Sequence, residues 1–273
     1  MTDYATVNRS NWDSRVPHHV NAYDFDSFTA NPEHLSPVVQ FGLPRLGTVA
    51  GLDVVHLQCQ IGTDTLSLFR LGARSVTGLD FSRPALDAAA RLAADCEARI
   101  NFVESELYGA TEALGSSSFD LVYTGLGAIE WLPDIRRWAE TVSVLLRPGG
   151  RLFMREFHPV LWTLSDSRTD DLLVIEYPYF QSEGLHFSED HSYVDHDEPL
   201  ASPDIIHFNH GIAKVIAALI NAGMHLTFIE EHETAPGRPL GDAMEDIGGG
   251  EYRLRRNPDR LPVSYTLQAA KGG

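Results

Sequence analysis

Short apolar runs alternate with amphipathic stretches between residues 53 and 157. Runs rich in apolar and β-branched residues predict strands over 53–57, 75–79, 100–104, 119–124 and 151–157. Between these strands, apolar residues at helical spacing predict helices over 63–71, 82–94 and 134–146. Strands that alternate with helices in this way predict a parallel sheet with helices on both faces.

The residues outside this region follow a different pattern. Residues 1–45 are polar and aromatic and predict short helices outside the sheet. Residues 163–208 form a long acidic and aromatic stretch with weak periodicity, and the glycine-rich residues 234–260 predict a surface excursion. The remaining predicted elements are a helix over 209–222 and two strands over 225–230 and 263–269.

The composition fits one large α/β domain in a reducing compartment. The chain has 273 residues, and 43% of them are hydrophobic, which is enough for a core of its own. Its two cysteines, Cys59 and Cys96, do not suggest a disulfide framework, and the first residues lack the pattern of a signal peptide. Because no window approaches the roughly 18 apolar residues of a membrane helix, we expect a cytoplasmic protein without a membrane span.

The charge balance narrows the class of partner. The chain has 38 acidic and 21 basic residues and a net charge of −17. Such a surface repels a long anionic polymer, which argues against nucleic acid and favours a neutral or cationic small molecule. The sequence leaves the oligomeric state open, including a homo-oligomer.

The turn after the first predicted strand is the most informative feature of the chain. An apolar strand, a tight turn, a helix start and a second strand ending at Asp80 have the layout of a nucleoside-binding βαβ unit. A dinucleotide site needs glycines where the backbone touches pyrophosphate, but Gln58 and Gln60 stand at those places and only Gly62 remains. A ligand with a ribose but no pyrophosphate fits this turn better.

Four segments resemble, in order, the motifs of class I S-adenosylmethionine (SAM)-dependent methyltransferases. They are residues 56–66, 80–82, 119–122 and 147–152. One of these motifs alone would be weak evidence, because nucleoside-binding turns recur in many proteins. Four in order, at the spacing of this family, imply that SAM is the cofactor and S-adenosylhomocysteine (SAH) the product.

The resemblance also implies a fold and a domain organisation. The fold is α/β and Rossmann-like, with a doubly wound, seven-stranded, mostly parallel sheet whose last strand is antiparallel. Residues 225–230 and 263–269 fit its closing hairpin. Residues 1–45 are then an N-terminal helical cap over the active site, and residues 46–273 are the catalytic domain with an acidic insertion at about 163–208.

The resemblance assigns the nucleoside half of the cofactor to the ends of the second and third strands. Asp80 is expected to accept hydrogen bonds from both ribose hydroxyls, with Phe81 beside it. Glu106 and Leu107 are expected to lie at the adenine, with Glu104 as the competing acid. A solvated loop charge is the alternative for either glutamate.

The methionine half of the cofactor is less well defined by the motifs. The family's first motif has an acid where this chain has His56, so a contact to the methionine ammonium must come from a backbone carbonyl or from elsewhere. Cys59 is expected to be a small filler rather than a nucleophile. The other residues expected to line the cofactor are Gln58, Gly62, Thr124 and Gly125.

His158 and Tyr23 are the candidate catalytic residues. Methyl transfer from a sulfonium is an in-line displacement, so a base is needed only where the acceptor must lose a proton. His158 follows the fifth strand, on the ligand side of the sheet, and histidine titrates near neutral pH. Tyr23 belongs to the N-terminal segment that often covers the pocket in this family; packing in the core is the alternative for both residues.

Aromatic residues are expected to line the acceptor side of the pocket. They are Trp12, His18, Trp131, Trp162 and Tyr177. Aromatic walls suit a ring or a cation, so we expect an amine or an aromatic acceptor, although aromatic residues are also common in cores.

The acidic insertion also contains a histidine pattern. His186, His191 and His196 recur every five residues, with Asp190 and Asp195 between them. This spacing matches neither one helix face nor the common zinc patterns, so we expect an acidic, solvated lid and no metal.

The sequence therefore predicts an enzyme that methylates nitrogen or oxygen, and less readily carbon, of a small molecule. Enzymes of this appearance often modify specialised metabolites, which is an analogy from fold and motif. The alternatives are a non-catalytic SAM-binding protein and a nicotinamide-dependent oxidoreductase on the same kind of sheet. A methyltransferase acting on macromolecules fits the acidic charge least.

Overall fold

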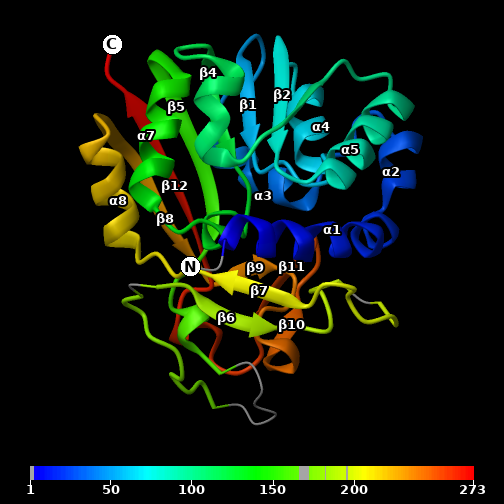
Figure 1. The fold of residues 1–273 in the computed structure, drawn as a ribbon, viewed down its shortest axis with the longest axis vertical. Coiled ribbons are helices and arrows are strands. Elements are labelled where there is room, and N and C mark those ends of the chain that lie inside the picture. Colours follow the sequence, from blue (N-terminus) through cyan, green and yellow to red (C-terminus); the bar gives the residue numbers. More distant parts are fainter. Residues whose placement is uncertain (1–2, 166–171, 182, 195) are drawn as a thin grey trace.

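A seven-stranded sheet forms the centre of the molecule (Figure 1). The computed structural model describes residues 3–165, 172–181, 183–194 and 196–273. The strands follow the order β3 (Asn101–Glu104), β2 (Ser75–Asp80), β1 (Asp53–Leu57), β4 (Phe119–Thr124), β5 (Leu146–Phe157), β12 (Ser264–Lys271) and β8 (Met224–His232). All neighbours from β3 to β5 are parallel, whereas β12 lies between β5 and β8 and is antiparallel to both. The predicted fold class is confirmed.

Helices cover both faces of this sheet. On one face lie α3 (Pro37–Leu46), α4 (Thr63–Arg70) and α5 (Arg83–Asp95); on the other lie α6 (Ala110–Leu114), α7 (Ile135–Leu145) and α8 (Ile212–Asn221). Neighbouring residues of β1 pack on opposite faces of the sheet: Val54 lies in the apolar core on the α3–α4 side, and Val55 lies in the core on the α7–α8 side. Helix α5 begins with a side-chain cap: the Ser82 hydroxyl accepts from the Ala85 N–H.

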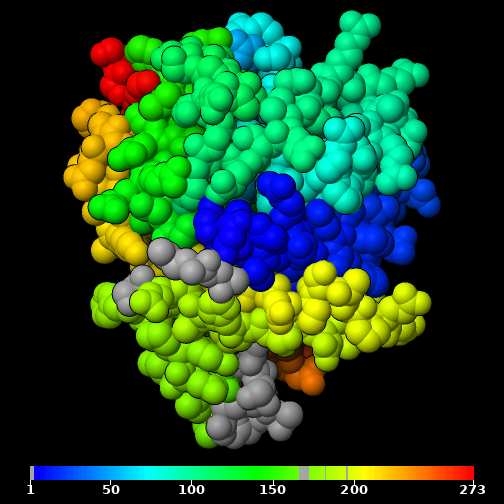
Figure 2. All heavy atoms as spheres, viewed as in Figure 1, coloured from blue at the N-terminus to red at the C-terminus, as the bar shows by residue number. Residues whose placement is uncertain are grey.

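The N-terminal residues form one long helix as well as two short ones, so the prediction of short helices alone was wrong. Helix α1 (Tyr4–Ala22) has 19 residues and precedes the short α2 (Phe25–Ala30). It runs across the carboxyl ends of the parallel strands (Figure 1) and lies between the sheet and the insertion at about residues 163–208 (Figure 2). Both of its sides are covered, so it buries polar residues such as Asn8 and Arg15 and lacks a simple apolar stripe.

The insertion is tied to α1 by polar contacts. It contains the antiparallel pair β6 (Leu185–Ser188) and β7 (Asp204–His207). The Asn8 side chain donates to the Ile206 carbonyl at 2.9 Å and accepts from the Ile206 N–H at 2.8 Å, as a neighbouring strand would. Asp195, one of the acids named in the histidine pattern, lies outside the described residues.

The glycine-rich region is a folded unit, so the prediction of a surface excursion was wrong. It forms a small sheet in the order β10 (Met244–Asp246), β11 (Glu251–Leu254) and β9 (Thr234–Pro236). Met244 and Leu254 are buried in an apolar cluster beneath it. The fully buried Arg155 of β5 joins the unit to the central sheet through a two-pronged ion pair with Glu251, at 2.7 and 2.9 Å.

None of the described helices combines the length and the apolar character that crossing a bilayer requires.

Candidate active site

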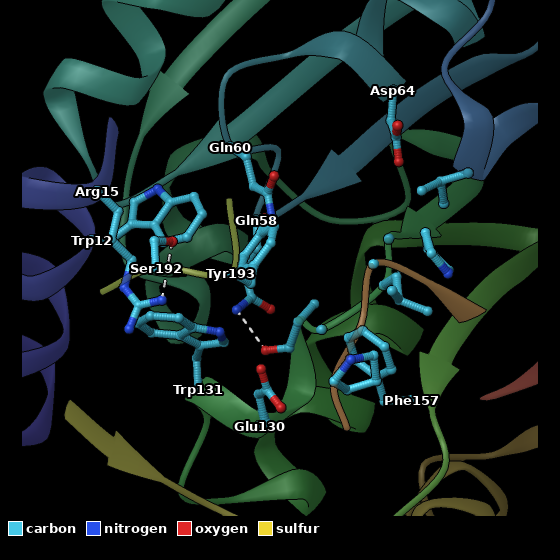
Figure 3. A pocket seen from close by; sticks show the side chains of 18 of the residues that line it. Trp12, Arg15, Gln58, Gln60, Asp64, Glu130, Trp131, Phe157, Ser192 and Tyr193 are labelled. Carbon is cyan, nitrogen blue, oxygen red and sulfur yellow. Dashed lines mark hydrogen bonds between the residues drawn. The ribbon is translucent and has the colours of Figure 1, made fainter. Parts of the chain in front are cut away.

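A cavity of about 420 Å³ lies at the carboxyl ends of the parallel strands, beneath α1. This is the edge at which open α/β sheets bind their ligands, and the volume suits a small molecule. Its walls come from the β1 turn, the end of β2, the loop after β4, α1, the insertion and residues 236–239. Figure 3 shows the side chains that point into it.

The β1 turn has the backbone of a glycine-rich turn without its glycines. Gln58 and Gln60 have φ values of 56° and 53°, in the left-handed region, and Gly62 has a φ of 84°. A side chain in this region costs about 1–2 kcal/mol, so contacts must hold the turn. The Gln58 side chain donates to the Ala128 carbonyl at 2.9 Å, and the Gln60 N–H donates to the Asp80 carboxylate at 2.9 Å.

Asp80 fixes this turn and also faces the cavity. Its two oxygens accept from the N–H groups of Gln60 and Ser82, each at 2.9 Å. The side chain is buried, and burial raises its pKa to about 6, although these N–H groups favour the charged form. Its position at the end of β2 is the one predicted for the acid that binds a ribose.

Asp64 lies beside His56, which stands where the family motif has an acid. It lines the cavity together with His56, and a Cβ atom placed on Gly125 would lie 3.4 Å from both the Asp64 Oδ2 and the His56 Nε2. His56 is neutral, because burial lowers its pKa to about 3, and its Nδ1 lies 2.9 Å from the Thr65 hydroxyl. Burial raises the pKa of Asp64 to about 6, while Ser36 and Tyr123 favour its charged form.

Gly62 and Cys59 pack the β1 turn closely against α5 and β2. A Cβ atom on Gly62 would lie 2.7 Å from that of Ala89, so only glycine lets α4 approach α5 here. The Cys59 sulfur fills the space over Gly78, and burial raises the pKa of its thiol well above the usual range. These contacts fit the predicted role of a small filler.

The loop after β4 is held by a second buried carboxylate. Glu156 of β5 accepts from the N–H groups of Gly127, Ala128 and Ile129 at 2.6 to 3.0 Å. Burial raises its pKa to about 7 in spite of these bonds. The loop leads into the short 3-10 helix η2 (Ile129–Trp131), which brings Glu130 and Trp131 to the cavity wall.

Ten of the predicted site residues line this cavity together. They are Trp12, Tyr23, His56, Gln58, Cys59, Asp80, Phe81, Gly125, Trp131 and Trp162. Tyr23 comes from the chain just after α1, and its hydroxyl lies 3.2 Å from that of Tyr193 in the insertion. The placement brings predicted cofactor and acceptor residues into one space, and their roles stay predictions.

His158, His18 and Tyr177 are not brought to this cavity. The His158 Nε2 lies 3.0 Å from a carboxylate oxygen of Glu231 on β8, and its Nδ1 accepts from the Val160 N–H. Both ring nitrogens are therefore engaged away from the site, and we do not retain His158 as the base. His18 stacks on His196 with ring centroids 4.0 Å apart, and Tyr177 lines a smaller neighbouring cavity.

The predicted adenine residues and Thr124 lie just outside the cavity lining. The Tyr4 hydroxyl donates to Glu106, which binds α1 to the end of β3. Leu107 and Thr124 are buried, and the Thr124 hydroxyl has no hydrogen-bond partner among the described residues.

Sequence reasoning missed several residues of the cavity wall. Among them are Asp64, Glu130 and residues 236–239. Asp64 has the pattern of an ordinary acid in the first turn of a helix. Residues 236–239 belong to the region that the sequence predicts to be a surface excursion. No group of three or more His, Cys, Asp or Glu side chains within the described ranges is arranged to hold a metal ion.

Comparisons with known structures define the class of fold. A SAM-dependent methyltransferase from Mesorhizobium loti is similar over 86% of this chain and 98% of its own, with a TM-score of 0.58 and 22% identity. The DhpI–SAH complex is similar over 98% of this chain and 97% of its own, with a TM-score of 0.57 and 14% identity. The fold is that of class I methyltransferases.

Sequence comparisons find related methyltransferases over part of the chain. Residues 55–152 match the family model described as a methyltransferase domain. The ubiquinone biosynthesis O-methyltransferase of Coxiella burnetii is 30% identical over 138 residues, which are 49% of this chain and 57% of that protein. The corresponding enzyme of Cupriavidus pinatubonensis is 32% identical over 44% of this chain and 47% of its own. This chain is therefore similar to class I SAM-dependent methyltransferases in its fold and over these residues, and it spans about half the length of the curated relatives it matches.

Proposed function

We propose that this chain transfers the methyl group of SAM to a nitrogen or oxygen atom of a small molecule. The observation that carries the proposal is the pair of enclosed carboxylates, Asp80 and Asp64, in one cavity at the strand ends of a class I methyltransferase fold. Asp80 would accept from the ribose hydroxyls, and Phe81 would lie beside the nucleoside. SAM, when bound, supplies a methyl group that its sulfonium has already activated.

Asp64 takes the place of the acid that the first motif lacks. A methionine ammonium needs a negative partner, and the ring of His56 is neutral and offers none. The Asp64 carboxylate lies beside His56 across the opening at Gly125, where no side chain blocks the approach. We therefore assign the ammonium to Asp64.

The rival functions fit the site less well. A nicotinamide dinucleotide would bring a pyrophosphate to a turn that carries the side chains of Gln58 and Gln60. A non-catalytic SAM-binding protein would have no need of an acceptor space, whereas this cavity continues past the turn to Trp131, Trp162 and residues 236–239.

The acceptor is a small molecule with an amine or an aromatic ring, and a specialised metabolite is one such class. A phenolic hydroxyl is the second candidate, because the curated relatives are named O-methyltransferases. The two cysteines are free thiols in the structure, which suits a reducing compartment such as the cytoplasm.

Calorimetry and turnover test the proposal together. SAM and SAH are expected to bind in the micromolar range and NAD to bind at least about 100 times more weakly. Turnover is followed as SAH released in the presence of a library of small amines and phenols. Tighter binding of NAD than of SAM would overturn the proposal, and SAM binding without turnover on any library member would favour the non-catalytic alternative.

A further inference from the structure

Glu130 is an enclosed carboxylate for which the cofactor site has no use. It lies in η2, and its side chain points into the lower part of the cavity beside Trp131, far from Asp64 in the view of Figure 3. Its Oε2 atom is buried and has no hydrogen-bond partner among the described residues. A buried carboxylate oxygen without a donor is costly, so this position favours a ligand that brings one.

Among the residues that the structure describes, no cation forms an ion pair with Glu130. Arg15 of α1 is the nearest cation, but it pairs with Glu189 of the insertion at 2.6 Å. Glu156 of β5 is satisfied by the backbone N–H groups of the β4 loop. Burial raises the pKa of Glu130 well above its usual range, and the charges of Glu156 and Glu189 raise it further. The charge of Arg15 and a hydrogen bond from the Trp131 side chain lower it.

Aromatic rings surround this carboxylate. Trp131 lies 5.5 Å from Trp12 and 6.2 Å from His207, measured between ring centroids. His207 lies 6.0 Å from Trp162, which lies 5.4 Å from Phe157. All five rings line the cavity and form a continuous belt, which we call the aromatic belt. A belt of ring faces and edges next to a carboxylate whose Oε2 atom has no partner among the described residues is suited to an organic cation.

Glu130 also lies where the main cavity meets a smaller one of about 80 Å³. Both cavities are lined by Glu130, Trp162, Glu189, His207 and Pro239. The smaller one extends beneath the insertion to Tyr177 and Phe187. An acceptor held at Glu130 could therefore extend away from the cofactor without competing with it for space.

From these contacts, and resting on the proposed function, we propose that the acceptor is a protonated amine whose ammonium binds Glu130 inside the aromatic belt. An ammonium has no lone pair, so one N–H bond must break before methylation, and Glu130 is placed to form the new O–H bond. The freed lone pair then forms the C–N bond while the C–S bond of SAM breaks, which leaves SAH and a methylated ammonium. The net charge is conserved in both steps: the proton transfer turns the ammonium and the carboxylate into a neutral amine and a neutral acid, and the methyl transfer moves one positive charge from sulfur to nitrogen.

Amine and alcohol probes of matched shape test this proposal. Benzylamine and phenethylamine, each with its corresponding alcohol, are titrated against the protein saturated with SAH at pH 7.5, by calorimetry and tryptophan fluorescence. We expect each amine to bind at least about ten times more tightly than its alcohol, because only the amine carries a charge for Glu130. Glu130→Gln should remove this preference and leave SAH affinity unchanged.

The control variant is Glu112→Gln, which removes the same charge from an exposed position on α6. It should keep the amine preference, and equal melting temperatures of both variants would exclude a folding defect. Equal binding of amine and alcohol by the wild type would overturn this inference, as would a preference for the alcohol. So would a loss of SAM but not SAH affinity in Glu130→Gln, because Glu130 would then face the sulfonium. Failure of SAH itself to bind would instead overturn the proposed function.

Discussion

The two ends of the cavity are assembled in different ways. The proposed cofactor end comes from β1, its turn and the end of β2, which lie within residues 53–82 and are fixed by backbone contacts to Asp80. The proposed acceptor end comes from α1, η2, the insertion and residues 236–239, which are far apart in the chain. A change at the first end should affect every adenosyl ligand, whereas a change at the second should affect only the acceptor.

Asp80→Ala should have the largest effect. It removes the proposed partner of the ribose and also the acceptor that holds the Gln60 N–H in the turn. We expect SAM and SAH to bind about 100-fold more weakly, or roughly 2–3 kcal/mol, by calorimetry. Asp87→Ala, an exposed acid on α5, is the control. Unchanged SAH affinity would show that Asp80 is only structural.

Asp64→Asn sharpens the comparison within the cofactor end. SAM and SAH carry the methionine ammonium, whereas 5′-methylthioadenosine lacks the amino acid part. We expect about tenfold weaker binding of SAM and SAH and no change for 5′-methylthioadenosine, since only a charge-assisted bond is lost. Equal losses for all three ligands would mean that Asp64 supports the turn instead.

The pH dependence of binding follows from the raised pKa values of Asp64 and Asp80. Both are about 6 in the free protein, so both carboxyls are largely protonated at pH 5 and ionised at pH 7.5. Since the ligand needs the ionised forms, SAM affinity should fall by about tenfold or more from pH 7.5 to pH 5, with proton release on binding near pH 6. Calorimetry in buffers of different ionisation enthalpy measures that release, and Asp64→Asn should reduce it. Affinity that does not vary with pH would contradict both assignments.

Glycine substitutions in the β1 turn should have the smallest effect. Gln60→Gly relieves a left-handed backbone and should raise the free energy of unfolding by about 0.5–1 kcal/mol. Gln58→Gly should gain less, because it also loses the hydrogen bond to the Ala128 carbonyl. Urea denaturation of the ligand-free protein measures both. A large loss of stability in Gln60→Gly would mean that its side chain, rather than Asp80, holds the turn.

The same contrast explains how much could be predicted from the sequence. The fold and the Asp80 position follow from local patterns: apolar runs, helix caps and a turn followed by an acid. The family resemblance then accounted for the antiparallel closing strand. These features depend on neighbours within about one βαβ unit, which is the range over which periodicity and turn chemistry are informative.

The acceptor end depends on contacts that no local pattern contains. His158 follows a strand as a catalytic residue would, yet Glu231 of β8 binds it because β12 brings that strand into the sheet. Helix α1 has no apolar stripe, because polar residues such as Asn8 bind the edge of β7. Glu130 is distinctive only through what surrounds it, namely the aromatic belt and the absence, among the described residues, of a donor to its Oε2 atom.

The position of β12 has a consequence for how the protein is made. This strand, residues 264–271, lies between β5 and β8 and supplies the hydrogen-bonding neighbour of each. A ribosome that has released the chain as far as β8 has therefore produced a strand that has no place yet in the sheet, and an open edge on β5. Both edges stay available to chaperones or to wrong partners until residues 264–271 emerge, so the nascent chain is most open to wrong pairing in the interval between the release of β8 and the release of β12.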